Sequence, residues 1–161
     1  MATNQKSRSA ILHGAKLVIA DVGTYQANMI DIAAKAEVSR ATVYNHFSDK
    51  SEMFLSLLES EIVRLINMAQ QAPTPADGLY ELSCAISTDL ALAQIRQSDP
   101  ADLTRLVSKN EHPLWRLFSG ELAKLFGTHS ALVEQWLIGQ IGTPLSQAES
   151  RAQADRFVLA L

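Results

Sequence analysis

The sequence predicts an all-α fold: a three-helix N-terminal module with a helix-turn-helix, joined by a fourth helix to a larger C-terminal helical bundle. Apolar residues recur at helical spacing along the chain, and no run of alternating apolar and polar residues reaches a useful strand length. Short breakers rich in Gly, Pro, Ser and Thr separate these segments. Hydrophobic residues make up 47% of the 161 residues, which is enough to fill a buried core.

The N-terminal module begins with two helices. A face of Ile, Leu, Val and Ala residues predicts a helix over residues 7–22, which Gly23 stops. A second helix is predicted over residues 29–36, with Ile32 and Ala33 on its inner face. Because Ala33 is small, it lets the next helix approach closely.

A tight turn and a capped third helix follow. Glu37 and Val38 form the turn, and the Ser39 hydroxyl is expected to accept hydrogen bonds from the free N–H groups of a helix over residues 40–46. Val38 and Val43 pack back against the preceding helix, so the polar residues of the third helix face outward. The residues expected on this outer face are Thr42, Asn45 and His46, with Tyr44 along its rim.

Caps and breakers bound the later helices. Ser48 is expected to cap the fourth helix, and the segment APTPADG ends it with two prolines and a glycine. The sequence SQAE at residues 146–149 is typical of a capping box at the start of the last helix. The predicted helices after the turn cover residues 49–72, 75–97, a segment from 100 onward, 114–126, 130–141 and 146–161.

Charge is distributed unevenly along the chain. Residues 1–50 hold six Lys or Arg residues against four acidic ones, a net charge of +2, whereas the remaining residues carry −5. A positive field confined to the first third is expected where that part alone meets phosphate. The start MATNQKSRSA lacks the apolar core of a signal peptide, and no apolar run approaches the roughly 20 residues that span a bilayer. We therefore expect a cytoplasmic protein that does not enter a membrane.

The residues around the turn resemble those of one protein family. The segment IAAKAEVSRATVYNHFSDKSEMF, residues 32–54, is similar to the pattern of the tetracycline-repressor (TetR) family of bacterial transcriptional regulators. That pattern is an apolar-Ala pair, Ala-Gly-Val-Ser, Thr-x-Tyr-x-His-Phe and a Lys shortly afterwards. The resemblance is close over about residues 7–58, and such a long ordered pattern is much more specific than a generic helix-turn-helix.

The resemblance implies a sequence-specific regulator of transcription and not an enzyme. We expect a repressor that binds double-stranded operator DNA as a homodimer and that a small-molecule effector releases. The implied domains are a helix-turn-helix DNA-binding domain over residues 1–50 and a helical ligand-binding and dimerisation domain over residues 51–161.

By the same resemblance, two sets of residues meet DNA. The set expected to bind phosphates is Thr42, Tyr44, His46 and Lys50. The set expected to reach base edges is Arg40, Ala41 and Asn45. One departure is Glu37, because the family usually has Gly at that turn position; a left-handed backbone there would cost a non-glycine residue about 1–2 kcal/mol.

Each of these residues also has an ordinary structural explanation. Tyr44 could cover the junction of the first and fourth helices, His46 could be a surface histidine, and Lys50 could simply be solvated. The joint order of the three after a helix-turn-helix is what favours DNA binding.

In the C-terminal bundle we expect a pocket for an unknown, largely apolar effector, because such pockets combine apolar walls with a few polar groups. The residues that offer this mixture are Tyr80, His112, Trp115 and Phe118. Aromatic residues at helical spacing are usually part of an ordinary core, which is the alternative explanation.

Two other classes of protein compete with a DNA-binding regulator. An enzyme would need a convergent acid, base or nucleophile set, and no Gly-rich phosphate loop, nucleophile elbow or metal motif supplies one; no cofactor is expected. Glu111, His112 and His129 have neither the number nor the spacing of a zinc site. Cys84 lies in the apolar segment LSCAIS, which predicts a buried, inert thiol. The other alternative is a helical protein-interaction module that has lost DNA binding.

The homodimer is expected to form mainly through residues 130–141 and 146–161. Twofold pairing places two recognition helices about 34–36 Å apart, which is one turn of DNA. The segments LVEQWLIGQI and DRFVLAL carry more apolar surface than one core requires, as in a self-complementary interface. The chain stops at Leu161 within an apolar run, earlier than most members of the family, so we expect this sequence to lack part of its dimer helix.

Overall fold

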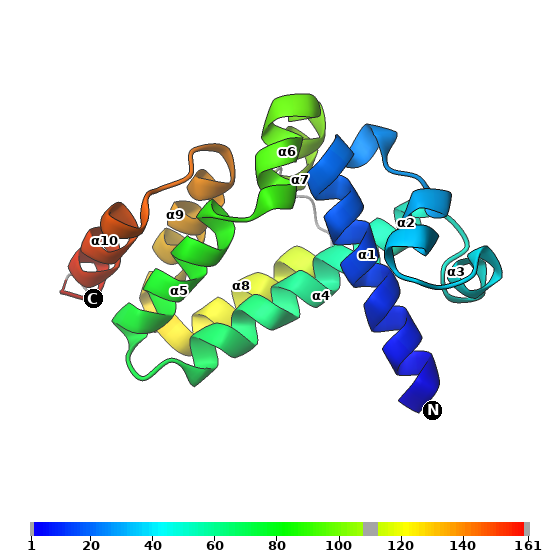
Figure 1. Ribbon diagram of the computed structural model, residues 1–161. Coiled ribbons are helices and arrows are strands. Elements are labelled where there is room, and N and C mark those ends of the chain that lie inside the picture. The colour runs from blue at the N-terminus through cyan, green and yellow to red at the C-terminus, as the bar shows by residue number, and fades with distance from the viewer. Residues whose placement is uncertain (1, 108–112, 160–161) are drawn as a thin grey trace. The chain divides into compact units, whose positions relative to one another are not determined.

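The computed structural model describes residues 2–107 and 113–159, and every element in these ranges is helical, so the all-α prediction is confirmed (Figure 1). Contacts divide the chain into two compact units. The first comprises Met1–Ser60 and Leu90–Asp102, and the second comprises Glu61–Asp89 and Leu103–Leu161. The helices are α1 (Ala2–Gln26), α2 (Met29–Lys35), α3 (Arg40–His46), α4 (Lys50–Gln71), α5 (Pro75–Ser87), α6 (Leu90–Ser98), α7 (Pro100–Val107), α8 (Pro113–Phe126), the 3₁₀ turn η1 (Gly127–His129), α9 (Ser130–Gly142) and α10 (Gln147–Leu159).

Local capping signals account for most helix boundaries. Helix α3 covers the predicted residues 40–46, and Ser39 caps it by accepting a hydrogen bond from the Thr42 amide at 3.0 Å. The capping box before α10 is also confirmed, because Ser146 N and Oγ donate to Glu149 Oε2 at 2.9 and 2.7 Å. Ser146 Oγ also accepts a hydrogen bond from the Glu149 amide at 3.3 Å, which completes the reciprocal pattern.

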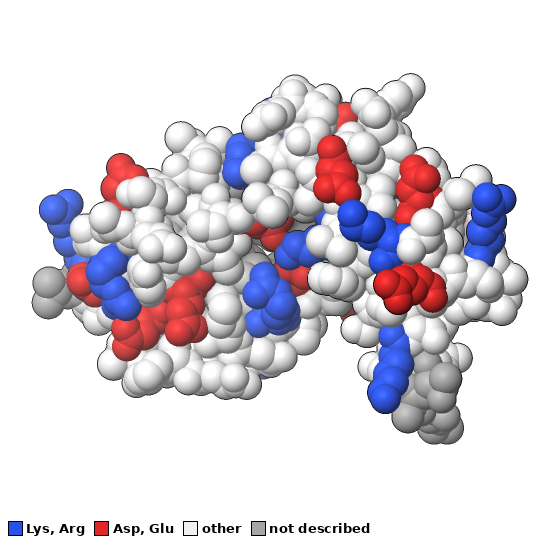
Figure 2. All heavy atoms as spheres, viewed as in Figure 1, with Lys and Arg blue, Asp and Glu red and all other residues white. Residues whose placement is uncertain are grey.

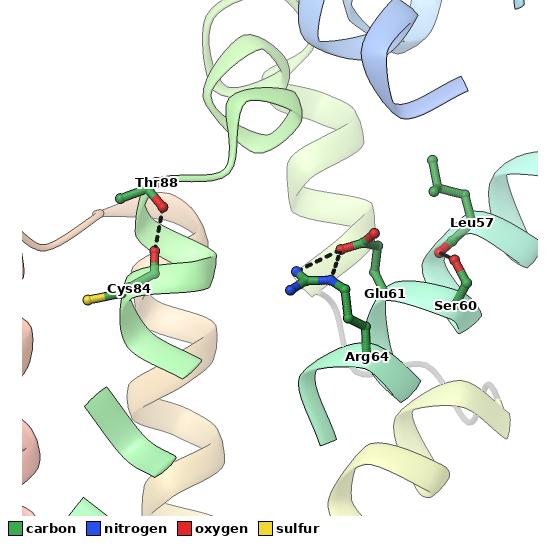
Figure 3. A network of polar contacts seen from close by, with 6 residues as sticks. All are labelled: Leu57, Ser60, Glu61, Arg64, Cys84 and Thr88. Carbon is green, nitrogen blue, oxygen red and sulfur yellow. Dashed lines mark hydrogen bonds and ion pairs between the residues drawn. The ribbon is translucent and has the colours of Figure 1, made fainter. Parts of the chain in front are cut away.

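Two sequence-based boundaries are wrong. The single helix predicted over residues 75–97 is two helices, because Thr88 ends α5: its hydroxyl donates to the Cys84 carbonyl at 2.7 Å and its amide donates to the same oxygen at 2.9 Å (Figure 3). Ser48 does not cap α4. Asp49 does so, since its Oδ1 accepts the Glu52 amide at 2.9 Å, while Ser48 N donates to Glu52 Oε2 at 2.7 Å.

The core of the first unit forms where α2 and α3 pack on α1. Ile11 of α1, Ile32 of α2 and Val43 of α3 are all fully buried. Burial of each such side chain stabilises the unit by about 1.5–3 kcal/mol. Gly14 allows the close approach of α1 to the end of α2, because a Cβ at this position would lie 2.9 Å from both the Cβ and the amide nitrogen of Ala36.

The turn between α2 and α3 has the geometry that usually calls for glycine. Glu37 has φ 56°, and its amide donates to the Ala34 carbonyl at 3.2 Å, while the Val38 amide donates to the Ala33 carbonyl at 3.0 Å. These two bonds form a Schellman motif with Glu37 at its left-handed position. Glu37 therefore adopts the left-handed conformation that costs a non-glycine residue about 1–2 kcal/mol.

A kink near the carboxyl end of α1 releases backbone groups that other segments then bind. Gly23 has φ 80° and ψ 175°, and one short turn follows it as far as Gln26. The freed amides of Thr24 and Tyr25 donate to Asp99 Oδ2 at 2.8 and 3.3 Å, and the Thr24 hydroxyl donates to Asp102 Oδ2 at 2.7 Å. Glycine is needed at the kink, because a Cβ would lie 2.5 Å from Asp99 Oδ2.

Lys50 binds the carbonyl groups of the same turn. Its Nζ donates to the carbonyl oxygens of Thr24, Tyr25 and Ala27 at 3.1, 3.3 and 3.1 Å. A cation at the carboxyl end of a helix also opposes the negative end of the helix dipole. We call the set of Thr24, Lys50, Asp99 and Asp102 the α1 clasp. Helix α6 packs along α1. The clasp holds the carboxyl end of α1 against Asp99 and Asp102, which follow α6 in the sequence.

In the second unit a buried polar network joins α5 to α9 and α10. Ser83 Oγ donates to Gln140 Oε1 at 2.6 Å and lies 2.7 Å from Ser150 Oγ, and all three side chains are at most 3% exposed. Ser87 extends the network, because its hydroxyl donates to Gln140 Oε1 at 3.2 Å and accepts the Leu145 amide at 3.0 Å. Buried polar groups that are all paired fix the register of the helices that carry them.

Replacement of Glu37 by glycine is expected to stabilise the protein. Glycine adopts a positive φ without the strain of a Cβ, and its larger loss of backbone entropy offsets only part of that gain, so Glu37→Gly should raise the free energy of unfolding by about 0.5–1 kcal/mol. Urea denaturation followed by circular dichroism measures the change. Glu37→Ala is the control, because it removes the charge and keeps the Cβ. A similar gain in both variants would show that the charge, and not the backbone, is responsible.

The clasp makes stability depend on pH through Asp99. Partial burial raises the pKa of Asp99, but hydrogen bonds from the Ser98 hydroxyl and from Thr24 and Tyr25 together outweigh it, so this pKa lies below its ordinary value. A carboxyl group with a lowered folded-state pKa contributes stability above its unfolded pKa of about 3.9 and loses that contribution as the pH falls through the folded pKa.

We therefore expect Asp99→Asn to lower the free energy of unfolding at pH 7, with a difference from wild type that shrinks as the pH falls below about 4. Urea titrations of both proteins between pH 3 and pH 7 measure this difference. A difference that stays constant over the whole range would contradict a role for the Asp99 charge in the clasp.

Candidate nucleic-acid interface

The exposed face of α3 consists of two pairs of residues one turn apart. Arg40 and Tyr44 form one pair, and Ala41 and Asn45 form the other; all four side chains are exposed. Tyr44 is 55% exposed, so it lies on the open face and not on the rim of the helix. This face contains the three residues expected to reach base edges, while Val43 anchors the opposite side in the core.

Thr42 and His46 are half-buried, which differs from the outward orientation predicted for them. The Thr42 hydroxyl lies 2.8 Å from Ser39 Oγ and so takes part in the cap of α3. The His46 ring lies in the last turn of α3, with its centroid 6.2 Å from that of Phe47. Both residues lie beside the exposed face, where polar groups meet a backbone more readily than base edges.

Lys50 is half-buried at the start of α4. An ammonium group has three N–H donors, and the three carbonyl contacts in the clasp use all of them. In this conformation Lys50 has no donor left for a phosphate. Its Nζ also lies over the ring of Phe54, 5.7 Å from the ring centroid.

Acidic residues lie close to the predicted DNA-binding face. Asp49 caps α4 and Glu52 lies in its first turn, and the hydrogen bonds from the Ser48 hydroxyl and amide lower the pKa of Glu52. Glu37 in the turn is exposed as well. On the face shown in Figure 2, basic and acidic side chains are interspersed without a continuous basic patch. Positive charge on this face is therefore carried by separate side chains and not by a broad basic surface.

Sequence reasoning missed the part that Asp99 plays. The Asp99-Pro100 pair correctly marked the start of α7, but the Asp99 carboxylate binds the end of α1, which lies 75 residues earlier in the sequence. No periodic or capping signal connects these two segments. The kink at Gly23 was the one available sign that backbone groups of α1 would need partners from elsewhere.

The residues proposed to line an effector pocket in the second unit do not converge on one place in the described parts. Trp115 packs against Phe118 within α8, with ring centroids 6.1 Å apart, and Phe118 is buried. Tyr80 of α5 instead lies under the Arg151 guanidinium of α10, 4.0 Å from Cζ to the ring centroid. Contact with the Cys84 thiol raises the pKa of the Tyr80 hydroxyl. His112 lies outside the described residues.

Of the residues considered as a nucleophile or as zinc ligands, Cys84 and His129 lie within the described residues. Cys84 is half-buried, so the prediction of a buried thiol is wrong, because its side chain lies on the face of α5 that Tyr80 shares. His129 ends the 3₁₀ turn η1. Glu111, like His112, lies outside the described residues.

Within the described ranges, none of the helices combines the length and the apolar composition that crossing a membrane requires. The longest of them, α1 and α4, both contain charged residues at intervals along their length.

Comparison with known proteins identifies the module that contains α2 and α3. The family model for bacterial regulatory proteins of the tetR family matches residues 11–57. Over 80 residues the chain is 35% identical to the HTH-type transcriptional activator FasR of Mycolicibacterium smegmatis (strain ATCC 700084 / mc(2)155). This match includes 49% of the chain and 36% of FasR, so the chain spans little more than a third of that relative.

Two crystal structures resemble the protein over almost its whole length. A protein of Mesorhizobium loti MAFF303099, assigned to the TetR family of transcriptional regulators, has a TM-score of 0.67 at 20% identity and covers 98% of this chain and 95% of its own. FadR of Bacillus subtilis, in complex with stearoyl-CoA, has a TM-score of 0.54 at 18% identity and covers 95% and 98%. At these identities the likeness shows the fold. The segment at residues 11–57 that contains the helix-turn-helix thus matches the tetR family of bacterial regulatory proteins, and the fold of the chain is similar to that of the two crystal structures.

Proposed function

We propose that this protein is a sequence-specific DNA-binding transcriptional regulator, and not an enzyme, whose helix α3 enters the major groove of operator DNA. The observation that carries the proposal is the exposed face of α3 on a helix held firmly from behind. Val43 and Phe47 are at most 1% exposed and fix α3 to the core, while Tyr44 and Asn45 between them remain open to a partner. A recognition helix needs this combination of a rigid mount and a free face.

The proposed contacts follow from exposure and chemistry. Arg40 can bind guanine and Asn45 can bind adenine with two hydrogen bonds each, and Ala41 leaves room for a thymine methyl group. Tyr44, Thr42 and His46 are proposed to bind backbone phosphates. For Lys50, the three carbonyl contacts favour a positioning role: it fixes the end of α1, from which the chain enters α2.

We further propose that residues 1–50 carry the DNA contacts and that residues 51–161 bind an effector and the second copy of a homodimer. Such a regulator acts in the cytoplasm, where bacterial DNA lies. Repression is the simplest outcome, since a dimer bound over a promoter excludes polymerase. The similarity to FasR, which is a transcriptional activator, favours activation as the second candidate. A reporter gene behind the bound promoter separates the two: deletion of the regulator raises expression under repression and lowers it under activation.

The effector is proposed to be a largely apolar small molecule. The apolar side chains of α8, including Trp115 and Phe118, support this proposal, and FadR of Bacillus subtilis offers a precedent through its bound stearoyl-CoA. A ligand that prefers one of two conformations shifts the protein towards it and so changes its affinity for DNA.

Asn45→Ala tests base reading by α3. Loss of a two-bond contact to one base should weaken binding to the selected operator by about 1–3 kcal/mol and relax the choice at one position per half-site. The salt dependence of binding should hardly change, because no phosphate contact is lost. Binding to operator and scrambled duplexes, measured by fluorescence anisotropy, gives both quantities. Gln71→Ala, an exposed amide at the end of α4, is the matched control. Equal weakening on both duplexes would contradict the assignment of Asn45.

Trp115→Ala tests the effector proposal. We expect this variant to bind operator DNA like the wild type at a temperature where both are folded, but to need a higher concentration of long-chain acyl-CoA or fatty acid for release. A gel-shift titration with these compounds measures the difference. Identical release curves for the two proteins would place the effector elsewhere or exclude this class of compound.

The dimer proposal predicts a mass in solution of twice the 17.6 kDa of one chain. Leu132 on α9 is 64% exposed, and the exposed glycines 139 and 142 continue its stripe, which would allow close packing of a second copy. Light scattering at micromolar concentration should show a dimer for wild type and a monomer for Leu132→Asp. Leu90→Asp is the control, because Leu90 is 73% exposed but lies on α6. A wild-type monomer would contradict the proposal.

A further inference from the structure

We propose that Arg8 is a further DNA-binding residue: its guanidinium, held over the ring of Phe47 at the end of α3, binds one operator phosphate per subunit. The inference rests on the proposed binding of DNA by α3, and it adds a residue from outside the helix-turn-helix to that site.

The position of Arg8 follows from the packing of α1 against the end of α3. Arg8 Cζ lies 5.3 Å from the centroid of the Phe47 ring. Phe47 is 1% exposed, directly follows the last residue of α3 and donates its amide to the Val43 carbonyl at 3.0 Å. Arg8 precedes the buried Ile11 by one turn on the same face of α1. The packing of α1 in the core therefore places the Arg8 side chain at the carboxyl end of α3.

The guanidinium has hydrogen-bond donors to spare. Among the residues that the structure describes, the Arg8 guanidinium stacks on the Phe47 ring and takes part in no side-chain hydrogen bond or ion pair. Arginine presents five N–H donors in a fixed plane, and stacking on an aromatic ring orients that plane without using any of them. Such an edge matches two oxygens of a phosphate. Since Arg8 is half-buried, the orientation of its edge is restricted while part of the side chain still meets solvent.

The surrounding charges explain why a cation is needed at this place. Asp49 at the cap of α4 and Glu52 in its first turn would repel a phosphate near the end of α3, and Lys50 has all its donors in the clasp. The pKa of Glu52 is lowered first by the Ser48 hydrogen bonds and also by the charge of Arg8. The positive charge of Arg8 therefore acts on the first turn of α4. The hydrogen bonds to Glu52 Oε2 come from the amide and hydroxyl of Ser48 and not from Arg8. Arg8 supplies both the compensating charge and the free donors.

A purely structural role for Arg8 would be the covering of Phe47. The aliphatic stem and flat head of arginine shield the edge of the core, and methionine, which is unbranched and of similar length, can do the same without charge. Arg8→Met therefore separates the two roles, because it keeps the cover and removes the donors.

The experiment uses the full-length protein and DNA duplexes that the wild type selects from a random library. Affinity is measured between 50 and 200 mM salt for wild type, Arg8→Met, Arg8→Gln and Arg8→Lys. We expect both neutral variants to reduce the salt-dependence slope by about 0.9 per subunit, so that each lost contact makes the fall in affinity over this range about 3.5-fold smaller. Arg8→Lys should keep the slope and lose only the affinity due to the two-oxygen geometry.

Lys35→Met is the matched control. Lys35 belongs to the same unit and pairs with Asp21 at 3.0 Å, so its removal changes the net charge equally without touching the proposed site. A slope of wild-type size for Arg8→Met and Arg8→Gln, with both proteins folded by circular dichroism, would overturn the inference and leave the proposed function intact. An equal change of slope for Lys35→Met would overturn it too, since net charge would then be the cause. If the wild type selects no duplex from the library, the proposed function fails and the inference falls with it.

Discussion

Backbone groups released by the kink of α1 must find partners, and the first unit is organised around that requirement. At Gly23 the chain leaves the helical conformation, so the amides and carbonyls of the following turn have no complete set of partners within α1. An unpaired backbone group in a partly buried place costs as much as a lost hydrogen bond. Asp99 binds the amides and Lys50 binds the carbonyls, each with the charge that suits its group.

The clasp links three segments that are distant in sequence: the turn after Gly23, the start of α4 and the residues around Asp99. Helix α2 begins only a few residues after the clasp, where Asn28 caps it by accepting the amides of Ile30 and Asp31 at 3.0 Å each. The Schellman motif at Glu37 then sets the direction from α2 to α3. The orientation of the exposed face of α3 is therefore the end result of a series of backbone pairings that starts at Gly23.

The sequence predicts those features whose causes are local. The limits of α3, the Ser39 cap and the capping box at Ser146 all follow from residues within a few positions of one another. The break at Thr88 was missed because the apolar period continues through it, while the competing bond from its hydroxyl to Cys84 leaves that period unchanged. Likewise, the spacing that placed Tyr80 among pocket residues cannot show that Arg151 covers its ring.

In the candidate site, too, local sequence predicts some features and not others. The exposed residues of α3 follow from the position of Val43, because one buried anchor fixes the facing of a seven-residue helix. The partners of Lys50 and Arg8 depend on tertiary packing, so no local pattern could assign them. The chemistry of Lys50 and Arg8 still limits the partners that each can have, because both are cations, and cations bind the carboxyl ends of helices and the faces of aromatic rings.

The buried network of Ser83, Gln140 and Ser150 has a consequence for the order of folding. Its bonds join residues 57 and 67 positions apart, whereas α2 and α3 are joined by contacts between near neighbours in the chain. Long loops close slowly, because their entropy is lost before any contact is gained. The network can form only after α9 and α10 have returned to α5, so it belongs to the last steps of folding. Since interactions absent from the transition state mainly slow unfolding, these three polar residues govern the lifetime of the second unit more than the rate of its formation.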